Sequence, residues 1–154
     1  MERTVKKILV ATDFSENAHK ALEYGLIFAR QLGARLYLTT VNELSPIRWA
    51  IHEGLLREDD TDETVQQRLK EFTNQKCADL LKGADCSDVD LQVVILSGDA
   101  ATEIVNYART NSIDLIVMGR RGFGRNPLIK EILGSVSDKV IRRAPCPVMV
   151  VNLR

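Results

Sequence analysis

The chain has 154 residues, of which 45% are hydrophobic and 27% are charged, and its 21 Lys and Arg residues balance its 21 Asp and Glu residues. This length and composition predict one folded domain over residues 1–154 and exclude a disordered chain, and the apolar runs are too short for a membrane-spanning helix. A formal net charge of zero argues against nonspecific binding of nucleic acid, which needs excess positive charge. Because no secretory signal is recognisable before the first apolar run, we expect a cytosolic (cytoplasmic) location.

Apolar runs of strand length alternate along the chain with amphipathic segments of helix length. Strands are expected at residues 5–11, 35–41, 91–96, 113–118 and 148–151. Helices are expected between the capping residue Ser15 and Gly33, at 62–82, at 100–110, and in two short pieces that start at Asn126-Pro127 and at Ser135. This alternation predicts an α/β fold in which an open sheet of five parallel strands carries helices on both faces.

Two features of the middle of the chain bear on packing. The helix expected at Asp62–Lys82 has an apolar stripe, which is made of Val65, Leu69, Phe72 and Leu80. The segment before it, Asn42–Asp60, is long for a mere connector and holds the only tryptophan. A lid, a partner surface and an ordered loop are all open interpretations of this segment.

The cysteines argue against a metal or disulfide framework. They are Cys77, Cys86 and Cys146, widely spaced and without a C-x-x-C pair, so neither a zinc site nor a disulfide is expected. Cys146 lies between two prolines before an apolar strand and is expected to be a small buried thiol.

The candidate ligand site follows from the predicted sheet. In an open α/β sheet, ligands bind at the carboxyl ends of the strands, where the strand order reverses. The segments expected there are Ala11-Thr12-Asp13, Val41-Asn42 and a glycine-rich stretch that begins at Gly119.

The glycine-rich stretch is the most informative of these segments. It contains Gly119, Gly122 and Gly124, and it leads to Gly134-Ser135, where a helix is expected to begin. Glycines let a backbone approach a ligand closely, and a helix start offers N–H groups to an anion. The hydroxyls of Ser135 and Ser137 add donors. The stretch therefore predicts a site for a di- or triphosphate.

Several better-known motifs are absent. Gly124 is followed by Arg-Asn rather than Lys-Ser/Thr, which excludes a Walker P-loop, and the turn after the first strand lacks the glycines of a dinucleotide fingerprint. A lone Asp13, with Ser97-Gly98 where an aspartate would be needed, argues against a phosphorelay receiver. The two histidines do not assemble into a Ser-His-Asp set.

Four sequence blocks resemble the universal stress protein family along essentially the whole chain. They are KKILVATDFSENAHKAL, SGDAATEIVNYA, DLIVMGRRG and LGSVSDKVIRRAPCPVMVV. The nucleotide-binding branch of that family carries G-x2-G-x9-G-(S/T), whose two halves match Gly119-x2-Gly122 and Gly134-Ser135. Here eleven residues separate the halves, and counting nine back from Gly134 gives Gly124 as the alternative second glycine. The resemblance implies an adenine nucleotide alpha-hydrolase-like fold with strand order 3-2-1-4-5.

The resemblance also implies roles for the residues around a base and ribose. Asp13 would lie beside the ribose or the metal-bound phosphates, and the main chain of Val41 would meet the adenine. Ala11 and Met118 would form apolar walls.

The same resemblance places the phosphates. Gly119 and Gly122 would lie against ribose and phosphates, and the phosphate tail would be held by Gly134, Ser135, Val136 and Ser137. The candidate site is completed by Thr12, Arg121 and Gly124. Mg²⁺ would bridge the phosphates, because it favours phosphate oxygens and water over an all-protein cage.

Three functions stay open at this point. The first is a cytosolic ATP-binding regulatory protein of the stress response, and the resemblance supplies the regulatory part. The second is slow ATP hydrolysis, for which Asp13 is the obvious candidate group. The third is a nucleotide-free interaction module. The resemblance further implies a homodimer paired through the terminal strand Val148–Val151, whose unpaired edge would otherwise be exposed.

Overall fold

The computed structural model describes residues 3–43, 51, 54, 57, 62–120 and 136–152. This part of the chain forms a five-stranded sheet in the order β3-β2-β1-β4-β5, in which every pair is parallel. The strands are β1 (Lys7–Ala11), β2 (Arg35–Asn42), β3 (Leu91–Ser97), β4 (Leu115–Gly119) and β5 (Val148–Val151). The predicted parallel sheet and its strand order are confirmed.

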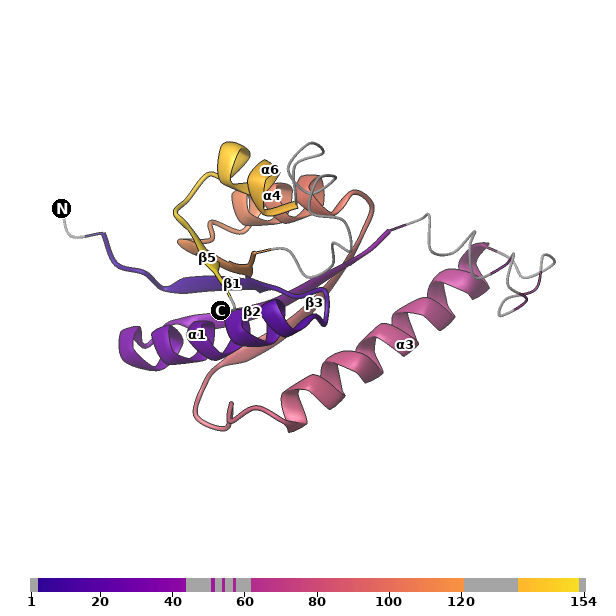
Figure 1. Cartoon of the computed structure of the whole chain (residues 1–154), viewed down its shortest axis with the longest axis horizontal. Coiled ribbons are helices and arrows are strands. Elements are labelled where there is room, and N and C mark those ends of the chain that lie inside the picture. Colours follow the sequence, from indigo (N-terminus) through magenta and orange to yellow (C-terminus); the bar gives the residue numbers. More distant parts are fainter. Residues whose placement is uncertain are drawn as a thin grey trace.

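Helices cover both faces of the sheet, as predicted. They are α1 (Glu16–Leu32), α3 (Asp62–Lys82), α4 (Ala100–Thr110) and α6 (Val136–Arg143). In Figure 1, α1 and α3 lie on one side of the sheet and α4 and α6 lie on the other. The short helix predicted at Asn126-Pro127 and the predicted helix start at Ser135 lie outside the described residues. No helix in the described part of the chain is long and apolar enough to cross a membrane.

Two strands start later than the apolar runs indicated. We expected strands at 5–11 and 113–118, whereas β1 and β4 begin at Lys7 and Leu115. Pairing between these two strands starts where Ile8 faces Leu115. The apolar residues at the start of the two predicted runs, Val5 and Ile113, pack in the core but lie outside the strands.

The alternation of side chains along the strands divides the core into two layers. Ile8 and Val10 of β1 pack with α1, whereas Leu9 and Ala11 pack with α4. The central strands are buried on both sides, which explains their continuous apolar runs. Each fully buried aliphatic side chain contributes about 1.5–3 kcal/mol relative to exposure.

Helix α1 begins and ends as its sequence predicts. The Ser15 hydroxyl accepts a hydrogen bond from the N–H of Ala18, and Gly33 ends the helix with φ 62° in the left-handed region. Gly25, in the middle, faces the sheet so closely that an added Cβ would collide with the Val10 side chain. Helix α1 therefore lies directly against β1.

The inward face of α3 differs from the expected stripe. Phe72 is 63% exposed, whereas Val65, Thr73 and Cys77 are buried and Leu69 is half-buried. These inward residues follow a spacing of four, and Phe72 lies about 100° around the helix from Thr73. A polar residue is accepted on this face because the Thr73 hydroxyl lies 2.8 Å from the Leu69 carbonyl and 3.1 Å from Asn42 Oδ1.

The three cysteines are free. Cys77, with 1% exposure, is the buried one. Cys146, which was expected to be a small buried thiol, packs against the core but is only half-buried. Burial raises the pKa of both thiols. The buried thiol comes from the inward row of α3, whose direction could not be read from the local sequence.

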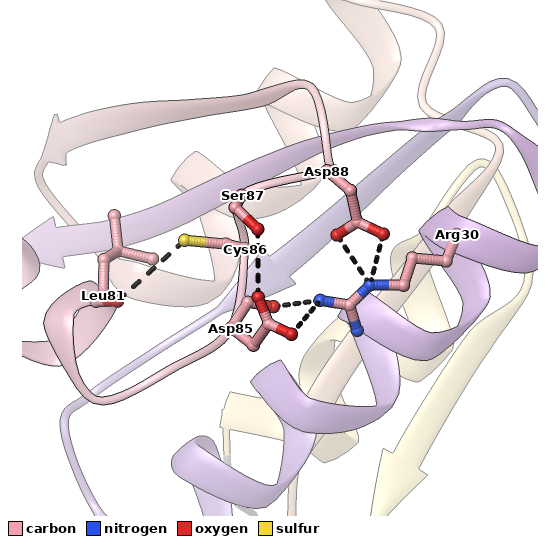
Figure 2. Close-up of polar contacts among 6 residues, drawn as sticks. All are labelled: Arg30, Leu81, Asp85, Cys86, Ser87 and Asp88. Carbon is pink, nitrogen blue, oxygen red and sulfur yellow. Dashed lines mark hydrogen bonds and ion pairs between the residues drawn. The ribbon is translucent and has the colours of Figure 1, made fainter.

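An arginine ties α1 to the connection between α3 and β3 (Figure 2). Arg30 Nε donates to both carboxylate oxygens of Asp88, at 2.8 and 3.1 Å, and its guanidinium also donates to the Asp85 carbonyl. The hydrogen bond from Arg30 holds the pKa of Asp88 below its usual value. The contact joins segments that are far apart in sequence at the amino-terminal edge of the sheet.

Candidate functional site

A pocket of about 650 Å³ opens where β1, β2 and β4 end. The strand order reverses between β1 and β4, so this is the topological switch point at which open α/β sheets bind ligands. Its volume falls within the range of about 300–1,000 Å³ that is typical of small-molecule and cofactor sites. It is lined by Ala11, Thr12, Asp13, Phe14, Ser15, Ala18, Thr39, Thr40, Val41, Asn42, Glu43, Leu69, Phe72, Thr73, Lys76, Ala100, Ile104, Met118, Gly119 and Val136.

One side of the pocket is apolar. Ala11, Val41 and Met118 belong to the core layer that packs on α4, and Ala100 and Ile104 of α4 close this side. The predicted apolar walls, Ala11 and Met118, therefore lie in one pocket with Val41. An apolar slot of this kind suits a flat ring system, because it removes the ring faces from water.

The turn between β1 and α1 forms a polar side. Its shape is held by side-chain acceptors, since Thr12 Oγ1 accepts from the Phe14 N–H at 3.0 Å and Asp13 Oδ1 accepts from the Ser15 N–H at 2.9 Å. Phe14 adopts φ 64°, a left-handed conformation that is costly for a bulky side chain. The turn thus presents Asp13 to the pocket in a constrained geometry.

Gly119 has a structural reason to be glycine. An added Cβ would lie 2.7 Å from the main-chain carbonyl carbon of Asn17, at the start of α1. The Asn17 side-chain amide also donates to the carbonyl of Arg120. The end of β4 and the first turn of α1 therefore pack backbone against backbone, and this contact shapes the pocket floor.

Helix α3 brings a cation to the pocket rim. The Lys76 ammonium lies 4.6 Å from the centroid of the Phe14 ring and 5.5 Å from that of Phe72. Both distances fit cation–π contacts. The charged side chains on the described lining are thus Lys76 and two carboxylates, Asp13 and Glu43.

The structure brings together most of the predicted site residues that it describes. Those on the pocket lining are Ala11, Thr12, Asp13, Val41, Met118, Gly119 and Val136. Ser137, which follows Val136 in the chain, is buried but does not line this pocket. The remaining predictions, Arg121, Gly122, Gly124, Gly134 and Ser135, lie outside the described residues, as does most of the segment 42–60.

Sequence reasoning missed several lining residues. Thr39 and Thr40 precede the predicted Val41, and Phe72 and Lys76 come from α3. A strand that contains two threonines among apolar residues was an available signal, because a buried hydroxyl needs a partner. No local signal placed α3 at the pocket, since that depends on the direction in which the helix crosses the sheet edge.

The described residues form no protein metal cage. Among them, no group of three or more His, Cys, Asp and Glu side chains lies close enough to hold a metal ion. Asp13 is an acidic residue on the pocket lining.

A sequence model described as the Universal stress protein family matches residues 4–152. The Universal stress protein MJ0531 of Methanocaldococcus jannaschii is 33% identical over 151 residues, which cover 98% of this chain and 84% of that protein. The solved structure of MJ0577, a protein of the same organism, is 29% identical to this chain. The two superpose with a TM-score of 0.77, and the match covers 99% of each chain.

A more distant structure has the same fold. The universal stress protein of Archaeoglobus fulgidus in complex with dAMP is 22% identical, with a TM-score of 0.59 and coverage of 97% of this chain and 99% of that one. Since the family model covers nearly the whole chain and a relative above 30% identity matches 98% of it, the chain belongs to the universal stress protein family.

Proposed function

We propose that this protein is a regulatory module that binds an adenine nucleotide, ATP with Mg²⁺, at the carboxyl edge of its sheet. One observation carries the proposal: the ends of three strands and the start of α6 meet in one pocket of nucleotide size at the strand-order reversal. The apolar side suits a base, and the polar turn at Asp13 suits the ribose and phosphates. A family member of the same fold is known in complex with dAMP, which supports an adenine nucleotide as the ligand class.

The charges on the pocket favour a metal-bound phosphate over a bare one. Two carboxylates, Asp13 and Glu43, and one cation, Lys76, line the pocket, so the net negative charge of the lining repels a free polyphosphate. Mg²⁺ offsets this repulsion, and it keeps several waters while taking one or two carboxylates and the phosphate oxygens as ligands. Asp13 would meet the ion from the protein side.

A thermal-shift titration with Mg-ATP tests the proposal. Ligand at about 100 times its dissociation constant stabilises a protein by about 2.7 kcal/mol, which at this size raises the melting temperature by about 5–10 °C. Ala100→Leu narrows the pocket from the start of α4 and should abolish the shift. Ala78→Leu adds the same side chain on the exposed face of α3 and should leave the shift intact.

The same titration separates the two alternative functions. No shift at millimolar Mg-ATP in the wild-type protein would contradict nucleotide binding and favour a nucleotide-free interaction module. A shift accompanied by phosphate release that Asp13→Ala abolishes would show slow ATP hydrolysis. Binding without release above background is the expected result for a regulatory module.

We further propose that the protein is a homodimer that pairs through β5. Strand β5 is at one edge of the sheet, and its three first residues, Val148, Met149 and Val150, are apolar and only half-buried. An unpaired apolar edge is prone to pair with another chain. Sedimentation equilibrium should give twice the monomer mass, and a monomer at micromolar concentration would contradict the proposal. The cytosolic location and the lack of nucleic-acid binding stay predictions from the sequence.

A further inference from the structure

Thr39 belongs to the apolar side of the pocket. Side chains alternate along a strand, and Tyr37, two residues before Thr39 in β2, packs in the core layer beneath α4. Across the ladder Thr39 faces Ala11, and both residues line the pocket. The Thr39 side chain is therefore on the face of the sheet that forms the apolar slot.

The Thr39 hydroxyl is buried without a partner. The residue is 0% exposed, and within the described part of the chain Oγ1 makes no hydrogen bond. The main-chain carbonyl of Thr39 does have a partner, because it accepts a hydrogen bond from the Thr12 N–H at 2.8 Å. By contrast, the buried hydroxyls of Thr12 and Thr73 are both hydrogen-bonded.

An unpaired buried hydroxyl is unfavourable, because water that solvated it in the unfolded chain has not been replaced. Valine has the same branched shape and a strong preference for strands, so packing alone does not account for threonine at this position. Because Thr39 lines the pocket, a molecule bound there would be a source of the missing partner.

The surroundings indicate the chemistry of that partner. Around Thr39 the slot is made of the apolar side chains of Ala11, Val41, Met118 and Ile104. A phosphate would lose its hydration there without gaining a cation, whereas a heteroaromatic base buries its faces and keeps polar atoms on its edge. We propose that the Thr39 hydroxyl hydrogen-bonds a nitrogen atom on the edge of the nucleotide base. The inference rests on the proposed nucleotide site and assigns one of its binding groups.

Three full-length proteins test this assignment: wild type, Thr39→Val and Thr39→Ser. Each is melted without ligand and titrated with Mg-ATP by calorimetry. Thr39→Val removes the unpaired hydroxyl, so the free protein should melt about 2–8 °C higher, while its dissociation constant for ATP should rise about two- to tenfold. Thr39→Ser keeps the hydroxyl but loses a buried methyl, so it should melt lower than wild type and bind ATP within about twofold of it.

A ligand-binding hydroxyl predicts that Thr39→Val is more stable than wild type but binds ATP more weakly. A hydroxyl with a purely structural role would not produce this combination. Wild-type affinity in Thr39→Val would overturn the assignment, and so would a Thr39→Val protein that is less stable than wild type, because the hydroxyl would then be paired inside the free protein. If wild type itself gives no heat with Mg-ATP, the nucleotide proposal fails and the assignment fails with it. If wild type binds and Thr39→Val binds equally, only the assignment of Thr39 fails.

Discussion

Replacing Gly119 by alanine tests whether this glycine serves the fold or only a ligand. The added Cβ would lie 2.7 Å from the Asn17 carbonyl carbon and 2.8 Å from the Asn17 carbonyl oxygen. Such distances are far inside van der Waals contact, and the obstacle is backbone, which has no rotamer to change. The first turn of α1 would have to move away from the end of β4.

Overpacking of this kind costs about 1–3 kcal/mol. For a chain of this length that corresponds to a fall in melting temperature of about 3–10 °C. Gly83→Ala is the matched control, because a Cβ there would meet only the Leu80 carbonyl, at an ordinary 3.6 Å. This control should be neutral or slightly stabilising, since alanine restricts the unfolded chain.

The assay is urea unfolding of the ligand-free protein, monitored by circular dichroism. Midpoints are compared between variants whose slope m, the dependence of the free energy of unfolding on urea concentration, is unchanged. Gly119→Ala should lower the midpoint relative to both wild type and Gly83→Ala. If Gly119 served only to let a ligand approach, the free Gly119→Ala protein would unfold at the wild-type midpoint. That result would refute the packing argument.

Three further predictions concern stability and thiol exposure. Ser15→Ala should lower the free energy of unfolding by about 1 kcal/mol, because the Ala18 N–H loses its cap; an unchanged urea midpoint would contradict this role. Arg30 lowers the pKa of Asp88 from the ordinary carboxyl value of 3.8, so the contact stabilises the folded state above that pH and is lost as the pH falls below it. Asp88→Asn should therefore lower the urea midpoint at pH 7 but not near pH 2, and an equal loss at both pH values would rule out the charge as the cause. Cys77 is 1% exposed, and burial raises its pKa. In the folded protein at pH 8, a maleimide should therefore label the other two thiols first, and it should reach Cys77 only when the protein unfolds. Equal labelling of all three in the folded protein would contradict its burial.

Much of the fold could be predicted because it depends on local signals. Helices α3 and α4 have the predicted limits, and α4 starts where the Asp99 side chain accepts the Thr102 N–H at 3.0 Å. Hydrogen bonds from Thr102 also lower the pKa of Asp99. Capping and helical periodicity are determined by residues within one or two turns, so they are visible in the chain itself.

Predictions that needed the direction of a helix were less successful. Phe72 was expected on the inward stripe of α3, but the helix turns Thr73 and Cys77 inward instead. Phe72 then becomes available to the Lys76 cation at the pocket rim. The periodicity of a helix gives the spacing of a face, whereas the face that is buried depends on the neighbour against which it packs.

The amino-acid sequence alone was enough for the order of the elements, the parallel sheet and the convergence of Asp13, Val41 and Gly119 at one edge, because parallel strands end at the same edge. Only the tertiary structure showed that Gly119 meets the backbone of Asn17 and that the Thr39 hydroxyl is buried without a partner in the described residues. Both facts depend on distances between segments far apart in the chain. Such distances result from how whole elements pack, and no local pattern of residues records them.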